Sequence, residues 1–283
     1  MRFNEPLNKK MLGEVDYGIF YSLFLLLAIG IVMIYSASSF YAMFKNSMYY
    51  LIRQGAFAVI GIIALVMMMK FDYHKLKKIT PYLLICTIPL LIAVFFFPEV
   101  NGARRWIKLG ILSFQPSELT KYVVVMFLAM SIDLKGDRIK RFWDGLVPYL
   151  AVAGFFAAMI LAEKNMSIAT IIMIVTFIML FVAGGQIKHL FGIIFPAMFS
   201  LAIFFIFSSD YRRARMLNFI DPWKDAAGDG YQLIQSFYAL GAGGITGLGL
   251  GESRQKILYM PEPHNDFIFS IVGEELGLVG CLF

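Results

Sequence analysis

The stretch MSIATIIMIVTFIMLFVAGGQIKHLFGIIFPAMFSLAIFFIF (166–207) decides the fold class. Lys188 and His189 are its only ionisable residues, and they separate two apolar runs. Each run is near the ~20 residues that an α-helix needs to cross ~30 Å of hydrocarbon. The whole chain of 283 residues is similar, with 59% hydrophobic and 16% charged residues, too few polar residues to cover a soluble domain. The sequence therefore predicts an all-α polytopic membrane protein.

Further apolar runs lie on both sides of this stretch. The 122–132 run is short, so its span must include the upstream residues Ser113–Lys121. A last run begins at Phe267 and continues to Phe283, which predicts seven complete spans, an interrupted eighth and a truncated chain. We expect a single transmembrane domain over 1–283, whose first span is too long for a cleaved signal peptide. The runs free of Asp, Glu, Lys and Arg are 17–44, 54–69, 79–98, 122–132, 145–162, 165–187 and 190–207.

The distribution of Lys and Arg predicts the orientation, because cytoplasmic loops carry more of them. With the N-terminus inside, the inner segments hold 12 Lys and Arg in 41 residues, and the outer segments hold 13 in 93. The sequence therefore predicts a cytoplasmic N-terminus and a long outer loop over about 208–266.

Many basic residues nevertheless lie in the predicted outer segments. Long loops can cross the membrane regardless of charge, and basic residues can also contact lipid phosphates. The alternative is an anionic substrate at the outer face, such as a lipid diphosphate, which arginine side chains bind well. The residues are Arg104, Arg105, Lys108, Arg212, Arg213, Arg215, Lys224, Arg254 and Lys256.

The long outer loop contains a predicted short helix and a glycine-rich segment. Leu233, Ile234, Phe237 and Tyr238 share one apolar helical face, which could lie in the membrane interface or pack on neighbouring helices. The glycines between 241 and 251 match neither a P-loop nor a dinucleotide-binding fingerprint. They predict tight turns and close approach of backbones.

The loop closes with PEPHNDFIFS (261–270), in which two prolines predict an extended segment. Asp266 stands just before the last apolar run, so it could be a helix N-cap or a partly desolvated general base. Glu262, His264 and Asp266 could also bind a divalent cation such as Mg or Mn, although alternate spacing on an extended strand would splay them apart.

Other ionisable residues lie near membrane depth, where their cost makes them functional candidates. Glu118 and Lys121 are three residues apart, so they share a helical face and can pair, either structurally or in a cavity. Gln115 and Ser117 add polarity beside this pair. Arg53 could anchor a span or line the same cavity. Glu274 and Glu275 lie within the last apolar run, so one or both must face the bundle interior or water.

Three long motifs, in this order, resemble the SEDS proteins (shape, elongation, division and sporulation). YSASS (35–39) and the DPW…GYQ…QS stretch of the second motif are most similar to the FtsW and SpoVE branch of that family rather than to RodA. The motifs are NGARRWIKLGILSFQPSELTK (101–121), DPWKDAAGDGYQLIQSFYALGAGGITGLGLGESRQK (221–256) and YMPEPHNDFIFSIVGEELGLVG (259–280).

The resemblance implies a SEDS-type bundle of ten helices, of which about seven and a half are present here. It implies an enzyme of cell division or sporulation that polymerises lipid II, the undecaprenyl-diphosphate-linked precursor, at the outer face of the bacterial cytoplasmic membrane. A class B penicillin-binding protein would supply the transpeptidase. The family's catalytic Asp falls on Asp266, and its outer cavity falls on Arg53, Trp106, Glu118 and Lys121. The turn Glu163–Ser167 departs from the family pattern.

The combined hypothesis is an inverting peptidoglycan glycosyltransferase with Asp266 as general base, whose partners are lipid II, the nascent glycan strand and membrane lipids, and not nucleic acid. A divalent cation could assist it. A lipid II flippase and a scaffold that recruits the transpeptidase are the alternatives. The predicted substrate-binding residues are Arg53, Arg104, Arg105, Trp106, Gln115, Ser117, Glu118, Lys121, Arg212, Arg213 and His264.

Overall fold

The computed structural model describes residues 15–42, 48–100, 102–109, 112–228, 230–257, 259–261 and 263–283. Contacts divide the chain into two compact units. Unit 1 comprises Met1–Phe71 and Phe204–Phe283, and unit 2 comprises Asp72–Ile203. The single domain expected from the sequence stays a prediction.

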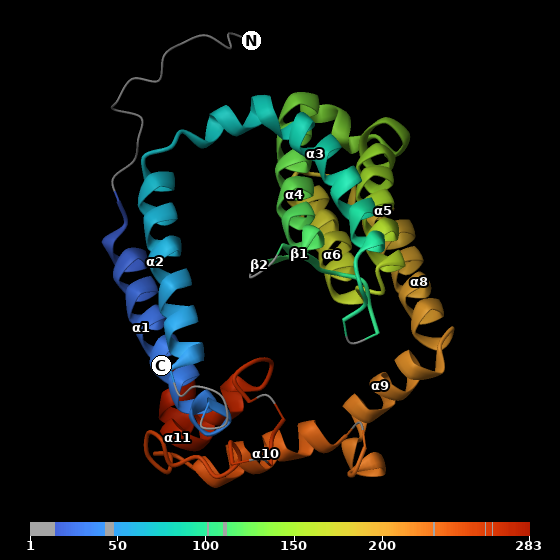
Figure 1. Cartoon of the computed structure of the whole chain (residues 1–283). Coiled ribbons are helices and arrows are strands. Elements are labelled where there is room, and N and C mark those ends of the chain that lie inside the picture. Colours follow the sequence, from blue (N-terminus) through green and yellow to red (C-terminus); the bar gives the residue numbers. More distant parts are fainter. Residues whose placement is uncertain are drawn as a thin grey trace. The chain divides into compact units, whose positions relative to one another are not determined.

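Unit 1 is built from helices at both ends of the chain (Figure 1). Its small core joins α1, α10, α11 and the loop before α11 through Met33, Ala37, Ala239, Met260 and Ile271. The helices are α1 (Tyr17–Ala42), α2 (Tyr49–Met69), α9 (Asp210–Ile220), a 3-10 turn (Pro222–Asp225), α10 (Tyr231–Gly243) and α11 (Ile268–Leu282).

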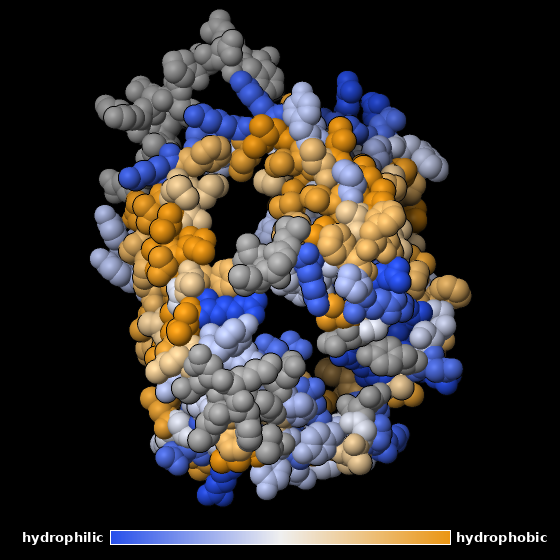
Figure 2. Space-filling model, viewed as in Figure 1, coloured by the Kyte–Doolittle hydropathy of each residue, from blue (hydrophilic) through white to orange (hydrophobic). Residues whose placement is uncertain are grey.

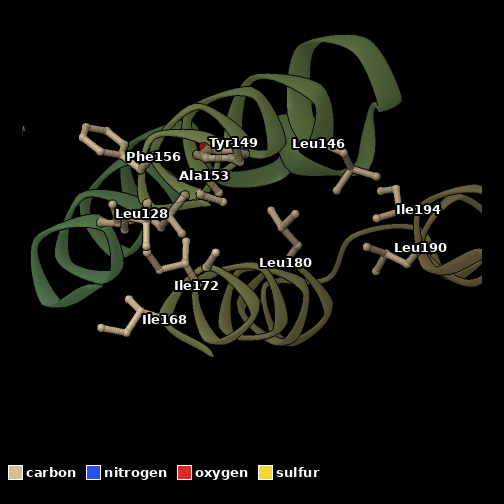
Figure 3. Packing of buried hydrophobic residues seen from close by; sticks show 14 of the residues in the cluster. Leu128, Leu146, Tyr149, Ala153, Phe156, Ile168, Ile172, Leu180, Leu190 and Ile194 are labelled. Carbon is tan, nitrogen blue, oxygen red and sulfur yellow. The ribbon is translucent and has the colours of Figure 1, made fainter. Parts of the chain in front are cut away.

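Unit 2 is a helical bundle with one short antiparallel hairpin, in which Ile107 pairs with Phe114. Its core packs α4, α5 and α6 together, and Figure 3 shows Leu128, Ala153 and Ile172 meeting between them. The main elements are α3 (Leu76–Ala93), β1 (Ile107–Leu109), β2 (Leu112–Phe114), α4 (Pro116–Lys135), α5 (Val147–Ala162), α6 (Met166–Val182), α7 (Ile187–His189) and α8 (Phe195–Phe207), whose last turn belongs to unit 1. Shorter 3-10 turns cover Tyr73–Lys75, Val94–Phe96 and Gly136–Lys140, and π-helical turns cover Phe142–Leu146 and Leu190–Ile194.

Five helical segments in the described residues are long and apolar enough to cross a membrane, and α6 is a shorter apolar helix. Figure 2 shows hydrophobic surface along the helices and hydrophilic residues toward their ends. The chain is therefore a multi-pass membrane protein, as the sequence predicts. The five segments are Tyr17–Phe40, Tyr49–Met69, Tyr73–Phe96, Phe142–Ala162 and Ile187–Phe207.

Two predicted span boundaries move for local reasons. The span expected from Ser113 begins as a helix only at Pro116, because Leu112–Phe114 form β2 and proline suits the first helical turn. The span expected to end at 187 ends as a helix at Val182, and Gly184 follows with a positive φ of 84°. Such a φ ends a helix and favours glycine.

The long outer loop contains more helix than the sequence predicts. The arginine-rich stretch after Asp210 forms α9, which was not predicted. The short helix predicted around Leu233 is present as α10. On its predicted apolar face Ile234 is buried, whereas Phe237 and Tyr238 are exposed, because α10 packs on α11 through a different stripe that includes Ala239 and Gly243.

The glycine-rich segment pairs with a break in α11. Gly277 has φ 67° and ψ −167°, which interrupts the helix. A Cβ on Gly247, whose φ is 79°, would lie 2.2 Å from the Glu275 carbonyl oxygen, so the predicted close backbone approach is confirmed. Four backbone hydrogen bonds of 2.9–3.1 Å join the two segments, from Leu248 N to Glu274 O, Gly249 N to Glu275 O, Leu278 N to Gly244 O and Val279 N to Ile245 O.

Gly247→Ala should lower the free energy of unfolding by roughly 1–3 kcal/mol, because alanine is strained at positive φ and its methyl group would meet the α11 backbone. Thermal unfolding in detergent measures the effect. Gly61→Ala is the matched control, since a Cβ on Gly61 in the middle of α2 meets nothing within 4 Å. Equal unfolding midpoints for the two variants would contradict the close approach.

Candidate functional site

Asp266 lies in a series of turns over residues 263–267, directly before α11. The extended segment predicted from Pro261 and Pro263 is therefore wrong, because a fixed proline φ is equally compatible with turns. The N-cap interpretation of Asp266 is also wrong, since Phe267 occupies the N-cap position of α11 without a side-chain cap. The Asp266 side chain is exposed rather than partly desolvated, so its carboxylate is open to an incoming hydroxyl group.

The segment that leads to Asp266 is anchored at several points. The Met260 side chain is fully buried in the core of unit 1, and its amide donates to the Gln255 carbonyl at 2.9 Å. Gln232 on α10 donates through Nε2 to the Pro261 carbonyl at 3.1 Å. The His264 ring lies 4.3 Å, between ring centroids, from Tyr50 on α2. These contacts hold the backbone of the segment while they leave Asp266 open.

Arg53 lies one turn after Tyr50 on the same helix. Its guanidinium donates to the Tyr49 hydroxyl at 3.4 Å and lies 5.9 Å from the centre of the Phe57 ring. The residue is exposed, as a side chain that contacts an anionic ligand must be. Tyr50 therefore links the helix that carries Arg53 to the loop that carries His264 and Asp266.

Arg212 and Arg213 make local contacts on α8 and α9. Arg212 donates to the Ser208 hydroxyl at 2.8 Å and lies over the Phe205 ring at 5.8 Å. Arg213 pairs with Asp210 at 3.0 Å, in an i, i+3 ion pair whose members are both exposed. An exposed pair of this kind is weak, so Arg213 can exchange its partner for a phosphate at little cost.

Glu274 and Glu275 face the interior of unit 1, one of the two environments expected from the sequence, but their contacts there, including the one with Lys256, were not predicted. Both glutamates are buried, at 0% and 1% exposure, and Lys256 is 5% exposed. Lys256 pairs with Glu275 at 2.8 Å. Its place among the outer basic residues expected to meet an anion is therefore wrong, because its charge is already paired within the protein.

In unit 2, Glu118 and Lys121 form the ion pair that their spacing predicts. The Lys121 Nζ lies 2.8 Å from Glu118 Oε2, and the Glu118 side chain is the more exposed of the two. The ammonium also lies 5.2 Å from the centre of the Tyr122 ring. One carboxylate thus holds the Lys121 head group near the first turns of α4.

Gln115 and Ser117 differ from the Glu118–Lys121 pair because they bind each other and Ser117 is buried. Ser117 is fully buried, and its hydroxyl oxygen accepts from Gln115 Nε2 at 3.1 Å and from Asn165 Nδ2 at 3.3 Å. Ser117 therefore ties the start of α4 to the turn between α5 and α6. Its hydroxyl group therefore lies beneath the surface, between the Gln115 and Asn165 side chains.

The loop before β1 carries the other predicted residues of unit 2. Arg104 pairs with Glu99 at 3.4 Å and donates to the Phe95 carbonyl at 3.0 Å. Arg105 donates to the Lys164 carbonyl, and Lys164 donates through Nζ to the Gly102 carbonyl at 3.0 Å. Trp106 is 36% exposed. These contacts hold the arginine-bearing loop against the turn at residues 163–165.

Glu163 is the most unusual group of this turn. Its side chain is 1% exposed, and neither carboxyl oxygen has a hydrogen-bond partner among the described residues. Burial raises the pKa of Glu163 from its ordinary 4.5 to about 8, and the positive charge of Arg105 opposes that rise. The carboxyl group is therefore mostly protonated at neutral pH.

The divalent cation considered from the sequence stays a prediction. Among them, no group of three or more His, Cys, Asp or Glu side chains could hold a metal ion. Glu262, one of the three predicted ligands, lies outside the described residues. We therefore assign no step to a cation.

Comparisons with known proteins agree with this architecture. The family model of cell cycle proteins, which covers FtsW, RodA and SpoVE, matches residues 17–283. A probable peptidoglycan glycosyltransferase FtsW from Geobacter sp. (strain M18) is 41% identical over 264 residues, which are 91% of this chain and 71% of the relative. Stage V sporulation protein E from Bacillus subtilis (strain 168) is 39% identical over 264 residues, which are 90% of this chain and 71% of the relative.

Solved structures share the fold. One, described as "Structural coordination of polymerization and crosslinking by a peptidoglycan synthase complex", has a TM-score of 0.73 and 28% identity, over 94% of this chain and 73% of the other. RodA from Thermus thermophilus has a TM-score of 0.62 and 24% identity, over 94% of this chain and 69% of the other. The predicted all-α, SEDS-type membrane fold is confirmed.

The protonated state of Glu163 predicts how stability depends on pH. The folded chain binds this proton more tightly than the unfolded chain does, so Glu163 makes the free energy of unfolding fall as pH rises from about 4.5 to about 8. Glu163→Gln should flatten that dependence and raise the unfolding midpoint at about pH 8, as measured by thermal unfolding in detergent. The exposed Glu252→Gln variant should retain the wild-type slope. A wild-type slope in Glu163→Gln would contradict the assignment.

Proposed function

Because this chain belongs to the FtsW, RodA and SpoVE family of cell cycle proteins, we propose that it is a peptidoglycan glycosyltransferase that polymerises lipid II into glycan strands. The structural observation that carries the proposal is the placement of Asp266. Its carboxylate is exposed, yet the segment around it is anchored to α2, α10 and the core of unit 1. A general base needs this combination of access and fixed position.

In the proposed reaction, Asp266 accepts the proton of the 4-hydroxyl of an acceptor lipid II. The hydroxyl oxygen then bonds to the anomeric carbon of the growing strand, while the bond from that carbon to the diphosphate oxygen breaks. The electron pair of this bond leaves with undecaprenyl diphosphate. Attack from the face opposite to the leaving group inverts the linkage from α to β.

The leaving diphosphate carries negative charge that basic side chains stabilise. In unit 1 we assign this role to Arg53, Arg212 and Arg213, and we assign His264 to substrate contact. The substrate contacts expected in unit 2 are kept as separate predictions: Lys121, Arg104, Arg105, Trp106 and Gln115. Glu118 orients Lys121 through their 2.8 Å contact, and Ser117 supports the start of α4.

We also propose the surroundings in which this reaction takes place. The N-terminus lies in the cytoplasm and the Asp266 loop lies at the outer face of the bacterial inner membrane in this proposal, which the distribution of Lys and Arg along the sequence supports. Lipid II and the nascent strand are the substrates there. A class B penicillin-binding transpeptidase is the proposed protein partner, in cell division or sporulation.

Asp266→Asn should lower lipid II polymerisation by about 10²–10⁴-fold, because the amide cannot accept the hydroxyl proton. Gel-resolved glycan chains, made from lipid II by the purified protein with its partner present, measure the effect. Asp144→Asn, which changes an exposed carboxylate, is the matched control and should keep the wild-type rate. Full polymerisation by Asp266→Asn would refute the role of Asp266.

The polymerisation assay in vesicles tests the flippase alternative, and a complementation assay in cells tests the scaffold alternative. A flippase would translocate lipid II without forming chains. A scaffold would remain functional in cells with Asp266→Asn. Chain formation without net translocation, lost in Asp266→Asn, supports the glycosyltransferase.

A further inference from the structure

The loop that carries Asp266 is closed at its base by a buried ion pair. The Lys256 ammonium donates to Glu275 Oε1 at 2.8 Å, to the Ser36 hydroxyl at 3.2 Å and to the Gly251 carbonyl at 2.6 Å. Ser36 on α1 donates to both oxygens of Glu275, at 2.7 and 2.8 Å. Three segments that are distant in sequence therefore meet at one carboxylate.

The neighbouring glutamate holds the start of the same loop. Glu274 accepts from the Ser253 hydroxyl at 2.5 Å, from the Arg254 amide at 2.9 Å and from the Gln255 amide at 3.4 Å. Ser253 in turn accepts from the Lys256 amide at 3.3 Å. Both glutamates thus bind the short turn that ends at Lys256. Glu274 binds the Ser253 side chain and two backbone amides, and Glu275 binds the Lys256 ammonium.

Stability alone does not account for this arrangement. Burying two charges is costly, and an apolar pair of similar volume often stabilises a protein as well or better. The adjacent core already supplies apolar packing through Met260 and Ile271, each 0% exposed. Directional bonds add what apolar contacts lack, because they define one register of the loop against α1 and α11.

That register controls the placement of Asp266. Lys256 stands ten residues before Asp266 and Glu275 stands nine residues after it, so their contact closes the segment between them. Within the closed segment, Met260 is buried and Pro261 is tied to Gln232, whereas Asp266 is exposed. A shift of the base of this segment would move the carboxylate, and a displacement of about 1 Å can cost about 10²-fold in rate.

We propose that Lys256 and Glu275 are positioning residues for Asp266, which they present to the acceptor hydroxyl by fixing the loop between α1 and α11. The inference rests on the proposed glycosyltransferase function. It adds a role for two residues that do not touch the substrate and that act only through Asp266.

The experiment compares lipid II polymerisation by the wild type, Lys256→Met, Glu275→Gln and the double variant Lys256→Met/Glu275→Met. Each single variant leaves a charge or a polar group without its partner and can misfold, whereas the double variant removes both charges together. The double variant should keep the wild-type unfolding midpoint. Its kcat should fall by about 10²-fold, with KM changed less than about twofold.

Two further measurements distinguish positioning from a structural role. In the Asp266→Asn background, the double substitution should change the residual rate by less than about twofold, because residues that act as a unit are not additive. Hydrogen exchange of residues 259–267 should be faster in the double variant. The exposed pair of Lys77 and Asp133, 2.6 Å apart, provides the control, and Lys77→Met/Asp133→Met should leave exchange and kcat unchanged.

The outcomes are separable. If Asp266→Asn is inactive while the folded double variant retains the wild-type kcat, the positioning role is overturned and the proposed function stands. Unchanged hydrogen exchange of residues 259–267 in the double variant also overturns it. If Asp266→Asn polymerises normally, the proposed function fails and the positioning role fails with it.

Discussion

A break in a packed helix leaves backbone amides and carbonyls that must find partners elsewhere, and this requirement organises unit 1. α11 breaks at Gly277, and the glycine-rich segment 244–251 supplies the missing partners through backbone hydrogen bonds on both sides of the break. The two backbones approach so closely that Gly247 has no room for a side chain. The glycine-rich segment and α11 therefore fold as one piece, although α11 begins after the loop that carries Asp266.

This backbone pairing brings the charged residues together. Once segment 244–251 lies against the broken turn of α11, the next residues of the chain run past Glu274 and Glu275. Ser253 and Lys256 then bind these two carboxylates, and Ser36 joins them from α1. The backbone groups freed by the helix break thus bind segment 244–251. This pairing also determines that Ser253 and Lys256 lie next to the two glutamates.

The sequence predicts those features that depend on neighbouring residues. Apolar run length predicts the membrane helices, and the i, i+3 spacing of Glu118 and Lys121 predicts their contact. The clustered glycines predict close backbone approach. A likeness in three long motifs predicts the family, and residues 17–283 match its model.

Features that depend on distant residues could not be predicted in this way. Lys256 is a charged residue in a predicted outer loop, where solvent exposure is expected. Nothing in its own segment indicates that it will contact Ser36, 220 positions earlier. The turn conformation around Asp266 depends on anchors from α2 and α10, and the two prolines alone are compatible with either an extended or a turned backbone. The break at Gly277 depends on hydrogen bonds with segment 244–251, which the residues around Gly277 do not indicate.

The distribution of burial and charge suits an enzyme that acts on a large substrate. The proposed general base has to be exposed to reach a sugar hydroxyl on the proposed lipid-linked substrate, so it cannot obtain a fixed position by being buried. Its position must come from the surrounding chain, which is the general requirement for a preorganised site. In unit 1 the desolvation cost falls on Lys256 and Glu275, whose mutual attraction and hydrogen bonds offset it, while Asp266 remains accessible. Separating the proposed general base from the groups that hold it lets one loop be anchored at its base and exposed at Asp266.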